Sequence, residues 1–138
     1  MNTEIMHKRF FPFVGRLPNG APFIESGRSK IFAFALTVAH IAAVGLPSAS
    51  LAWLVAALVE ISGGARLLAN HLTRPAVLGM IAFLIATAIF FHSNLAYQNQ
   101  MFHCLKNLMM AGGLLQIAYF GTAPLSLDER KSNKPAVV

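Results

Sequence analysis

Three long runs of apolar residues stand out in the second half of the chain. They extend from about residue 48 to 70, from 75 to 92 and from 104 to 121, and polar residues are sparse within each. An apolar helix of about 20 residues is long enough to cross the hydrocarbon core of a bilayer. The pattern therefore predicts three membrane-spanning helices. Pro75 falls in the first turn of the second run, where its missing N–H breaks no helical hydrogen bond.

The first third of the chain supports two interpretations. Hydropathy alone favours a first span over residues 31–46, although this run is short. The alternative, residues 10–28, contains several polar or helix-breaking residues: Arg16, Pro18, Asn19, Gly20, Pro22, Glu25 and Arg28. Prolines inside a helix remove backbone hydrogen bonds and clash with the preceding turn, so composition argues against a helix there. A late signal peptide with its apolar region at 31–46 is disfavoured, because an unusually long segment would precede it.

The composition decides the class of protein. Of the 138 residues, 56% are hydrophobic and 12% are charged. Soluble domains contain about 25% charged residues, so this chain has too few to cover a surface that faces water. An ordinary soluble enzyme and a disordered chain are therefore excluded. The prediction is an all-α, integral membrane four-helix bundle in a single domain, with the lipid bilayer as its surroundings.

The basic residues predict how the bundle is oriented. The formal net charge is +6, and the Lys and Arg residues lie in small groups at segment ends. The groups that decide the orientation are Lys8 and Arg9, then Arg66 and Arg74, and finally Arg130, Lys131 and Lys134. The positive-inside rule places both termini in the cytoplasm, whichever first span is correct. A nucleic acid is not expected as a partner, because no basic stripe is interleaved with aromatic residues.

A series of short motifs follows one another between residues 13 and 128. They are Gly15-Arg16, Pro22-Phe23, Ser26-Gly27, Lys30-Ile31, Gly45-Leu46-Pro47, Val59-Glu60-Ile61-Ser62-Gly63-Gly64, Thr73-Arg74, Phe91-His92, Gln98, Leu105-Lys106-Asn107-Leu108, Gly112-Gly113-Leu114-Leu115 and Ser126-Leu127-Asp128. In this order and spacing they resemble the DoxX family of small four-helix bacterial inner-membrane proteins. The resemblance implies one domain over residues 1–128, a first span at 10–28, a short interfacial or re-entrant helix at 31–44, and a polar cytoplasmic tail at 129–138.

The resemblance also implies a function. The family includes members tied to thiosulfate:quinone oxidoreduction and to defence against thiol oxidants. It therefore implies a subunit or accessory of a quinone-linked redox system in the inner membrane, with subunits of a redox complex as partners. Kinship of fold does not by itself establish catalysis. A noncatalytic partner that stabilises a larger complex, or a proton-coupled carrier of a small solute, remain alternatives, and a homo- or hetero-oligomer is compatible with each.

Glu60 is the most informative candidate residue. It lies near the middle of the predicted span 48–70, where an uncompensated carboxylate is costly. It is either a functional acid or a structural residue that fixes helix packing through a hydrogen bond. At about 1.5 Å per residue, Arg16 lies about 9 Å and Glu60 about 13 Å from the inner edges of their spans. These depths make Arg16 the predicted partner of Glu60.

A second polar group is predicted near the outer face. His92 ends one span, and His103 and Lys106 open the next. With a first span at 10–28, Glu25, Arg28 and Lys30 belong to the same group. Gln98 lies on the link before them, and Asn107 follows Lys106 in a family motif. Imidazole and ammonium groups beside lipid are suited to bind a quinone carbonyl or to receive a proton from a quinol. The alternative is that Lys106 and His92 simply extend to the lipid headgroups.

Other prosthetic groups are not favoured. A haem held by two histidines needs imidazoles at matched depth, and no spacing on one helix supports this for His40, His92 or His103. No His-x-x-x-His pair or acidic cluster predicts a metal site. The single cysteine, Cys104, excludes a disulfide within the chain.

Two glycine pairs are candidates for close helix packing. Gly63-Gly64 lies in the second span and Gly112-Gly113 in the fourth, and small residues allow helix backbones to approach closely in membranes. Helical spacing places the first pair on one face of the second span, which is made of Ala56, Glu60, Gly63, Gly64 and Leu67. This face is expected to point inward, with the fourth span as its neighbour.

Overall fold

The computed structural model describes residues 3–71 and 73–121, and within them every regular element is a helix. The helices are α1 (Thr3–Phe32), α2 (Phe34–Ala43), α3 (Ala49–Ala69), α4 (Thr73–Phe91) and α5 (Gln98–Phe120). The predicted all-α class is confirmed for these residues. The tail at 129–138 and the motif at 126–128 lie outside the described residues.

The prediction from composition that residues 10–28 are not helical is wrong, because these residues belong to helix α1. It runs for 30 residues and continues through Pro12, Pro18 and Pro22. A regular spacing of buried residues explains why: Arg16, Gly20, Phe23 and Gly27 form one face of α1 and are all buried. This face packs along α3, which is the most extensive helix–helix interface of the molecule. Packing of this face offsets the hydrogen bonds that the prolines remove, as happens for prolines within membrane helices.

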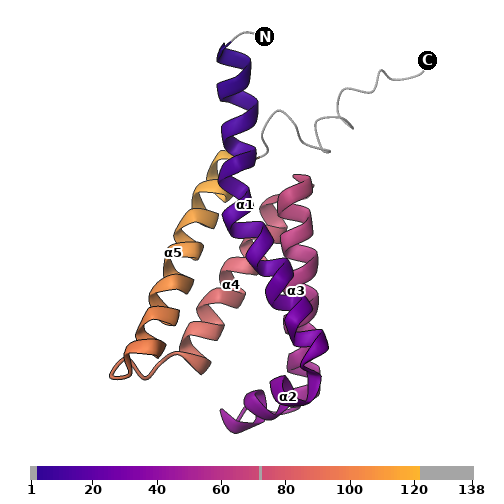
Figure 1. The fold of residues 1–138 in the computed structure, drawn as a ribbon, viewed down its shortest axis with the longest axis vertical. Coiled ribbons are helices and arrows are strands. Elements are labelled where there is room, and N and C mark those ends of the chain that lie inside the picture. Colours follow the sequence, from indigo (N-terminus) through magenta and orange to yellow (C-terminus); the bar gives the residue numbers. More distant parts are fainter. Residues whose placement is uncertain (1–2, 72, 122–138) are drawn as a thin grey trace, which may run out of the picture.

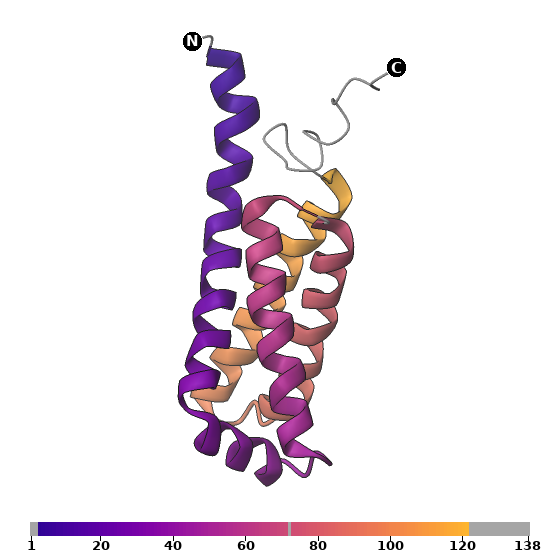
Figure 2. The same ribbon diagram turned by 90° about the vertical axis from the view of Figure 1, so that its right-hand side faces the viewer.

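Helix α2 is too short for the span that hydropathy favours at 31–46. It has 10 residues, which corresponds to about 15 Å, or half of the hydrocarbon core of a bilayer. It follows α1 after a break at Ala33 and lies across one end of the bundle (Figures 1 and 2). The interpretation of 31–46 as a single crossing helix is therefore wrong, and a short helix in this region, as the resemblance implies, is present.

The four long helices run side by side, as Figure 2 shows most clearly. Helix α1 packs on α3, α4 packs on α5, and α3 also contacts α4. The start of α1 and the end of α5 lie at the end of the bundle opposite α2 (Figure 1). The two pairs of helices, α1–α3 and α4–α5, thus form opposing walls, and α2 crosses the end between them.

The core is apolar and the outward surface is apolar as well. The core residues come from all four long helices: Phe23, Leu67, Val77, Met80, Ile81, Leu84, Ala111 and Leu114. Large apolar side chains also cover the outside, and Phe32, Leu36 and Met109 are each more than three-quarters exposed. Among the described residues, α3 and α4 are long and apolar enough to cross a membrane. An apolar exterior of this kind is compatible with lipid as the surrounding medium.

The bounds of α3 and α4 lie close to the predicted spans, whereas α1 and α5 begin earlier than predicted. Helix α1 extends over 3–32, against a predicted span of 10–28. Helices α3 and α4 extend over 49–69 and 73–91, against predicted spans of 48–70 and 75–92. Helix α5 begins at Gln98, well before the predicted start at 104. The early turns of α5 carry Gln98, Asn99, Gln100 and His103, so hydropathy does not detect them although they are helical.

Candidate functional site

Glu60 lies on the inward face of α3, as its spacing predicts. Ala56, Glu60, Gly63, Gly64 and Leu67 are all buried. The carboxylate belongs to the middle of the helix, and its side chain is 7% exposed. Glu60 is therefore a buried acid in an apolar bundle, where its charge must be compensated by neighbouring groups.

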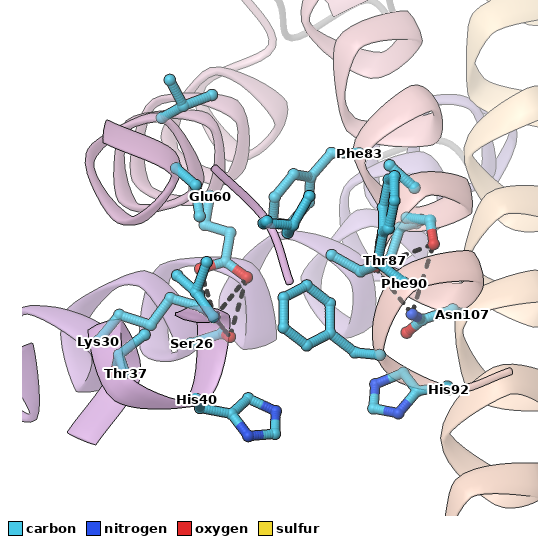
Figure 3. A pocket seen from close by; sticks show the side chains of 18 of the residues that line it. Ser26, Lys30, Thr37, His40, Glu60, Phe83, Thr87, Phe90, His92 and Asn107 are labelled. Atoms are coloured by element: carbon cyan, nitrogen blue, oxygen red, sulfur yellow. Dashed lines mark hydrogen bonds and ion pairs between the residues drawn. The ribbon is translucent and has the colours of Figure 1, made fainter. Parts of the chain in front are cut away.

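Two residues of α1 compensate this charge. Lys30 Nζ donates a hydrogen bond of 2.9 Å to Glu60 Oε1, and Ser26 Oγ donates one of 3.0 Å to the same oxygen. Lys30 Nζ also donates to Ser26 Oγ at 2.9 Å, which closes a triangle of three side chains (Figure 3). Hydrogen bonds between charged groups are shorter and stronger than neutral ones. The cluster is thus an ion pair reinforced by a hydroxyl group.

The second carboxylate oxygen of Glu60 is only partly satisfied. Oε2 lies 2.8 Å from Lys30 Nζ, which is an ion-pair distance. It is nevertheless fully buried and receives no well-directed hydrogen bond from any described residue. The short distance to the ammonium group stabilises this oxygen electrostatically although the bond is poorly directed. A buried acceptor without a well-directed donor is unusual.

Arg16 is not the partner of Glu60, so that prediction is wrong. Arg16 is buried and donates a hydrogen bond of 3.1 Å to the carbonyl oxygen of Gly121, at the end of α5. Arg16 precedes Lys30 by 14 residues on the same helix, which corresponds to about 21 Å. The depth estimate fails because Arg16 lies at the end of the bundle, level with the end of α5, and Gly20 one turn later already faces Leu68 near the end of α3.

Glycine at position 27 allows α1 to approach Glu60. A Cβ atom at Gly27 would lie 3.1 Å from the Cβ of Glu60 and 2.6 Å from the Cγ1 of Ile61. The position is thus too close to α3 for any larger residue without movement. Trp53 Nε1 also donates to the carbonyl oxygen of Lys30 at 2.9 Å, which ties the end of α1 to α3. These two contacts hold Ser26 and Lys30 beside the acid.

A second polar cluster lies on the opposite wall, between α4 and α5. Asn107 is buried, and its Nδ2 donates to Thr87 Oγ1 at 3.0 Å and to the carbonyl oxygen of Leu84 at 3.4 Å. The side-chain oxygen of Asn107 takes part in neither bond. The two bonds of Nδ2 therefore fix the orientation of the Asn107 amide group, and its oxygen atom makes no hydrogen bond to a described residue.

The predicted histidines meet beside this cluster. The rings of His92 and His103 stack with centroids 4.9 Å apart and an interplanar angle of 19°. Lys106 Nζ lies 3.3 Å from His103 Nδ1. Stacking brings the ring faces together and not their nitrogen atoms, so this pair does not have the geometry of two axial haem ligands. Within the described residues, no group of three His, Cys, Asp or Glu side chains is suited to hold a metal ion.

A cavity of about 650 Å³ separates the two polar clusters (Figure 3). Its volume falls within the range of small-molecule sites, which is about 300–1,000 Å³. Its polar lining residues are Ser26, Lys30, Thr37, His40, Ser48, Glu60, Thr87, His92, Lys106 and Asn107. Most other lining residues are apolar. The structure thus brings four candidates, Glu60, His92, Lys106 and Asn107, to one cavity.

Two of the candidate residues, Arg16 and Gln98, do not line this cavity. Arg16 contacts the opposite end of α5, and Gln98 is the exposed first residue of that helix. Conversely, the partners Ser26 and Thr87 were not assigned a site role from the sequence. The spacing of Ser26 and Lys30 by four residues on one helix face could have indicated a shared partner. Thr87 carries no such signal within its apolar run.

One side of the cavity is open and apolar. Leu51 and Val55 of α3 and Phe90 of α4 line it, and each is about half exposed. This rim lies on the outward surface of the bundle, at the end where α2 crosses. A molecule with an apolar tail is therefore able to place its polar part inside and extend its tail outward.

The glycine pairs differ from expectation in their neighbours. Gly64 faces α1, because a Cβ there would lie 2.7 Å from the carbonyl oxygen of Gly20. Gly63 faces Met80 of α4. The fourth span is thus not the neighbour of this pair. At the other pair, a Cβ on Gly112 would meet nothing within 4 Å, and Gly113 faces the side chain of Asn19 at ordinary contact distance.

Comparison with known proteins gives three findings. A model of the DoxX family matches residues 11–93, which include Glu60 and its partners on α1. The chain is 35% identical over 112 residues to the inner membrane protein YqjF of Escherichia coli (strain K12), covering 81% of this chain and 85% of that protein. It is 30% identical over 113 residues to the inner membrane protein YphA of the same strain, covering 78% and 81%. No solved structure matches the chain.

Proposed function

This chain belongs to the DoxX family, and from that premise we propose that it acts as a subunit or accessory of a quinone-linked redox system that handles electrons from thiosulfate or thiols. The chain is a protein of the bacterial inner membrane. The cavity is the proposed quinone site. Its buried carboxylate, Glu60, is the observation that carries the proposal, because this acid lines a mainly apolar cavity whose volume suits an amphiphilic ring compound.

The proposed topology has four crossings, with both termini in the cytoplasm. Helices α3 and α4 are apolar enough to cross unaided. Helix α1 would cross because its charges are compensated: Lys30 pairs with Glu60, and Glu25 forms an ion pair of 2.7 Å with Arg28. Helix α5 runs antiparallel to α4 beside it. Helix α2 and the cavity would then lie near the outer face, within reach of the membrane pool of lipid-soluble molecules.

The residues of the cavity fit a quinone in three respects. Its lining is mainly apolar, it has an apolar opening for a tail, and it presents hydrogen-bonding groups on opposite walls. A bound quinone would supply reversible two-electron, two-proton chemistry. The carboxyl group of Glu60 lines one wall and is a candidate to exchange a proton there. On the other wall, His92 and Lys106 are suited to donate hydrogen bonds and to exchange protons with the outer surface.

The proposal is tested by identifying what the protein retains. The protein would be purified in mild detergent and extracted for mass spectrometry of quinones. We expect quinone in the wild type and a loss of at least half of it in His92→Ala and in Lys106→Ala. Arg66→Ala serves as the control, because Arg66 is exposed near the end of α3 remote from the cavity. Absence of quinone from the wild type, or equal retention by all variants, would contradict the proposal.

The same purification separates the alternative functions. A noncatalytic partner would copurify with a larger complex in both cavity variants, without quinone. A proton-coupled carrier is the second candidate, which the buried pair of Glu60 and Lys30 beside a cavity favours. It would move a solute into vesicles in a manner that depends on Glu60 and on a proton gradient.

A further inference from the structure

The end of the bundle where α2 crosses carries a group of four basic side chains. They are His40 of α2, His92 directly after α4, and His103 and Lys106 of α5. Lys106 Nζ lies 3.3 Å from His103 Nδ1, and the rings of His103 and His92 stack 4.9 Å apart. His40 stacks on Phe91 at 5.3 Å, and Figure 3 shows it pointing toward His92. We call these four residues the basic cluster.

No described carboxylate pairs with the basic cluster. The two carboxylates whose surroundings the structure describes are engaged on α1: Glu60 pairs with Lys30 at 2.8 Å, and Glu25 pairs with Arg28 at 2.7 Å. Lys106 therefore keeps an unneutralised charge among the described side chains, and the imidazoles beside it add hydrogen-bond donors. Ammonium and imidazolium groups form their strongest hydrogen bonds with anionic oxygens, so the cluster favours an anion.

The members of the basic cluster also act on one another electrostatically. Burial, and then the positive charges of the other three members, lower the pKa of His92, which lies beyond the last residue of α4. Two further titratable features face His92: Cys104 lines an outward groove with it, and the ion pair of Lys30 and Glu60 lines the other wall of the cavity. A bound anion would offset the repulsion within the cluster and favour protonated histidine. Binding should therefore strengthen as the pH falls.

Resting on the topology in the proposed function, we propose that the basic cluster binds the phosphate group of a phospholipid beside the opening of the cavity. The surface around the cluster suits acyl chains, because Leu36 of α2 is 77% exposed and the rim of Leu51, Val55 and Phe90 is about half exposed. A lipid phosphate gains from this apolar surface, whereas a free phosphate ion does not. In the proposed topology this end of the bundle lies near the outer face, where lipid headgroups are close by.

The test measures the affinity for phosphatidylglycerol. The purified full chain is titrated with this lipid in detergent, and native mass spectrometry gives Kd at about pH 5.5 and about pH 7.5. We expect the wild type to bind at least about fivefold more tightly at the lower pH. In His40→Gln/His103→Gln, which leaves the residues of the proposed quinone site unchanged, most of this pH response should disappear, and binding at the lower pH should weaken about tenfold. Arg66→Gln is the matched control, because it removes an exposed charge near the end of α3 remote from the cavity.

Two further ligands, tested on the wild type, keep the result independent of how the variants fold. A diacylglycerol with the same chains lacks the phosphate, and we expect it to bind about tenfold more weakly than phosphatidylglycerol. Inorganic phosphate lacks the chains, and we expect it not to displace the lipid even in large excess. Equal binding of the two lipids, or unchanged binding in the double variant, overturns the inference. Displacement by inorganic phosphate assigns the cluster to the free ion and overturns the lipid. Each of these outcomes leaves quinone retention, and thus the proposed function, intact.

Discussion

Lys30 lies near the end of α1 and Glu60 near the middle of α3, and they meet inside an apolar bundle. The carboxylate is almost fully buried, while the lysine side chain is 25% exposed. Burying both charges is costly, and removing one of them leaves the other uncompensated. The pair therefore binds α1 to α3 and at the same time keeps a carboxylate available at the cavity.

Removal of the lysine tests this dependence. We expect Lys30→Met to destabilise the protein by about 3 kcal/mol, because Glu60 loses its cation in an apolar site. Replacing both charges, in Lys30→Met/Glu60→Leu, should restore most of the loss. Thermal unfolding in detergent measures both effects. Arg66→Met is the control, since Arg66 is exposed near the end of α3. If Lys30→Met melts at the same temperature as Arg66→Met, the pair does not hold the helices together.

For single residues, the sequence predicted the burial of Glu60 but not its hydrogen-bond partners. Burial of Glu60 and its position on the glycine face followed from helical spacing, and the cavity lining contains four of the candidates. The partner of Glu60 did not follow, because the depth arithmetic took residue 10 as the inner edge of the bundle, whereas Arg16 itself lies level with the end of α5. The helix starts at Thr3, in a segment whose polar and proline residues hide it from hydropathy. The bonds between Asn107 and Thr87 depend on how α4 and α5 pack, which no local pattern specifies.

At the scale of elements, α1 is the helix whose stability depends most on its neighbour. Its three prolines lower its intrinsic helix propensity, and its buried face of Arg16, Gly20, Phe23 and Gly27 must pack on other helices. The backbones of α1 and α3 approach most closely where Gly20 faces Gly64. Small residues at such a crossing increase the van der Waals contact between membrane helices. Family resemblance, and not composition, indicated this helix.

The two glycine pairs provide a matched comparison of helix packing. A side chain at position 64 must displace the backbone of Gly20 or the side chain of Ile24, whereas one at position 112 meets open space. We expect Gly64→Leu to destabilise the bundle by about 1–3 kcal/mol through overpacking. Gly112→Leu should change stability by less than about 0.5 kcal/mol. Melting temperatures in one detergent give both values, and equal losses would show that the α1–α3 contact is not special.

At the scale of the whole molecule, two helix pairs and one crossing helix surround the cavity. The pairs α1–α3 and α4–α5 supply the polar walls, while α2 adds Thr37 and His40 at the end of the cavity. The open rim of Leu51, Val55 and Phe90 faces the surroundings of the bundle. In the proposed function, this rim is the route by which a lipid-soluble molecule enters the cavity. The order of the elements and the class of the fold were predictable, but the cavity arises from how the two pairs diverge.

Photolabelling with an azidoquinone tests most directly whether this cavity is the ligand site. The purified protein would be labelled at low ligand concentration, digested and sequenced by mass spectrometry. We expect the label on cavity-lining segments of α2 and α4, around Thr37, Phe83 and Phe90, and we expect excess decylubiquinol to abolish it. Label confined to the outward face of α5, around Phe102 and Met109, and unaffected by the competitor, would show that quinones merely dissolve around the protein, and it would contradict the account.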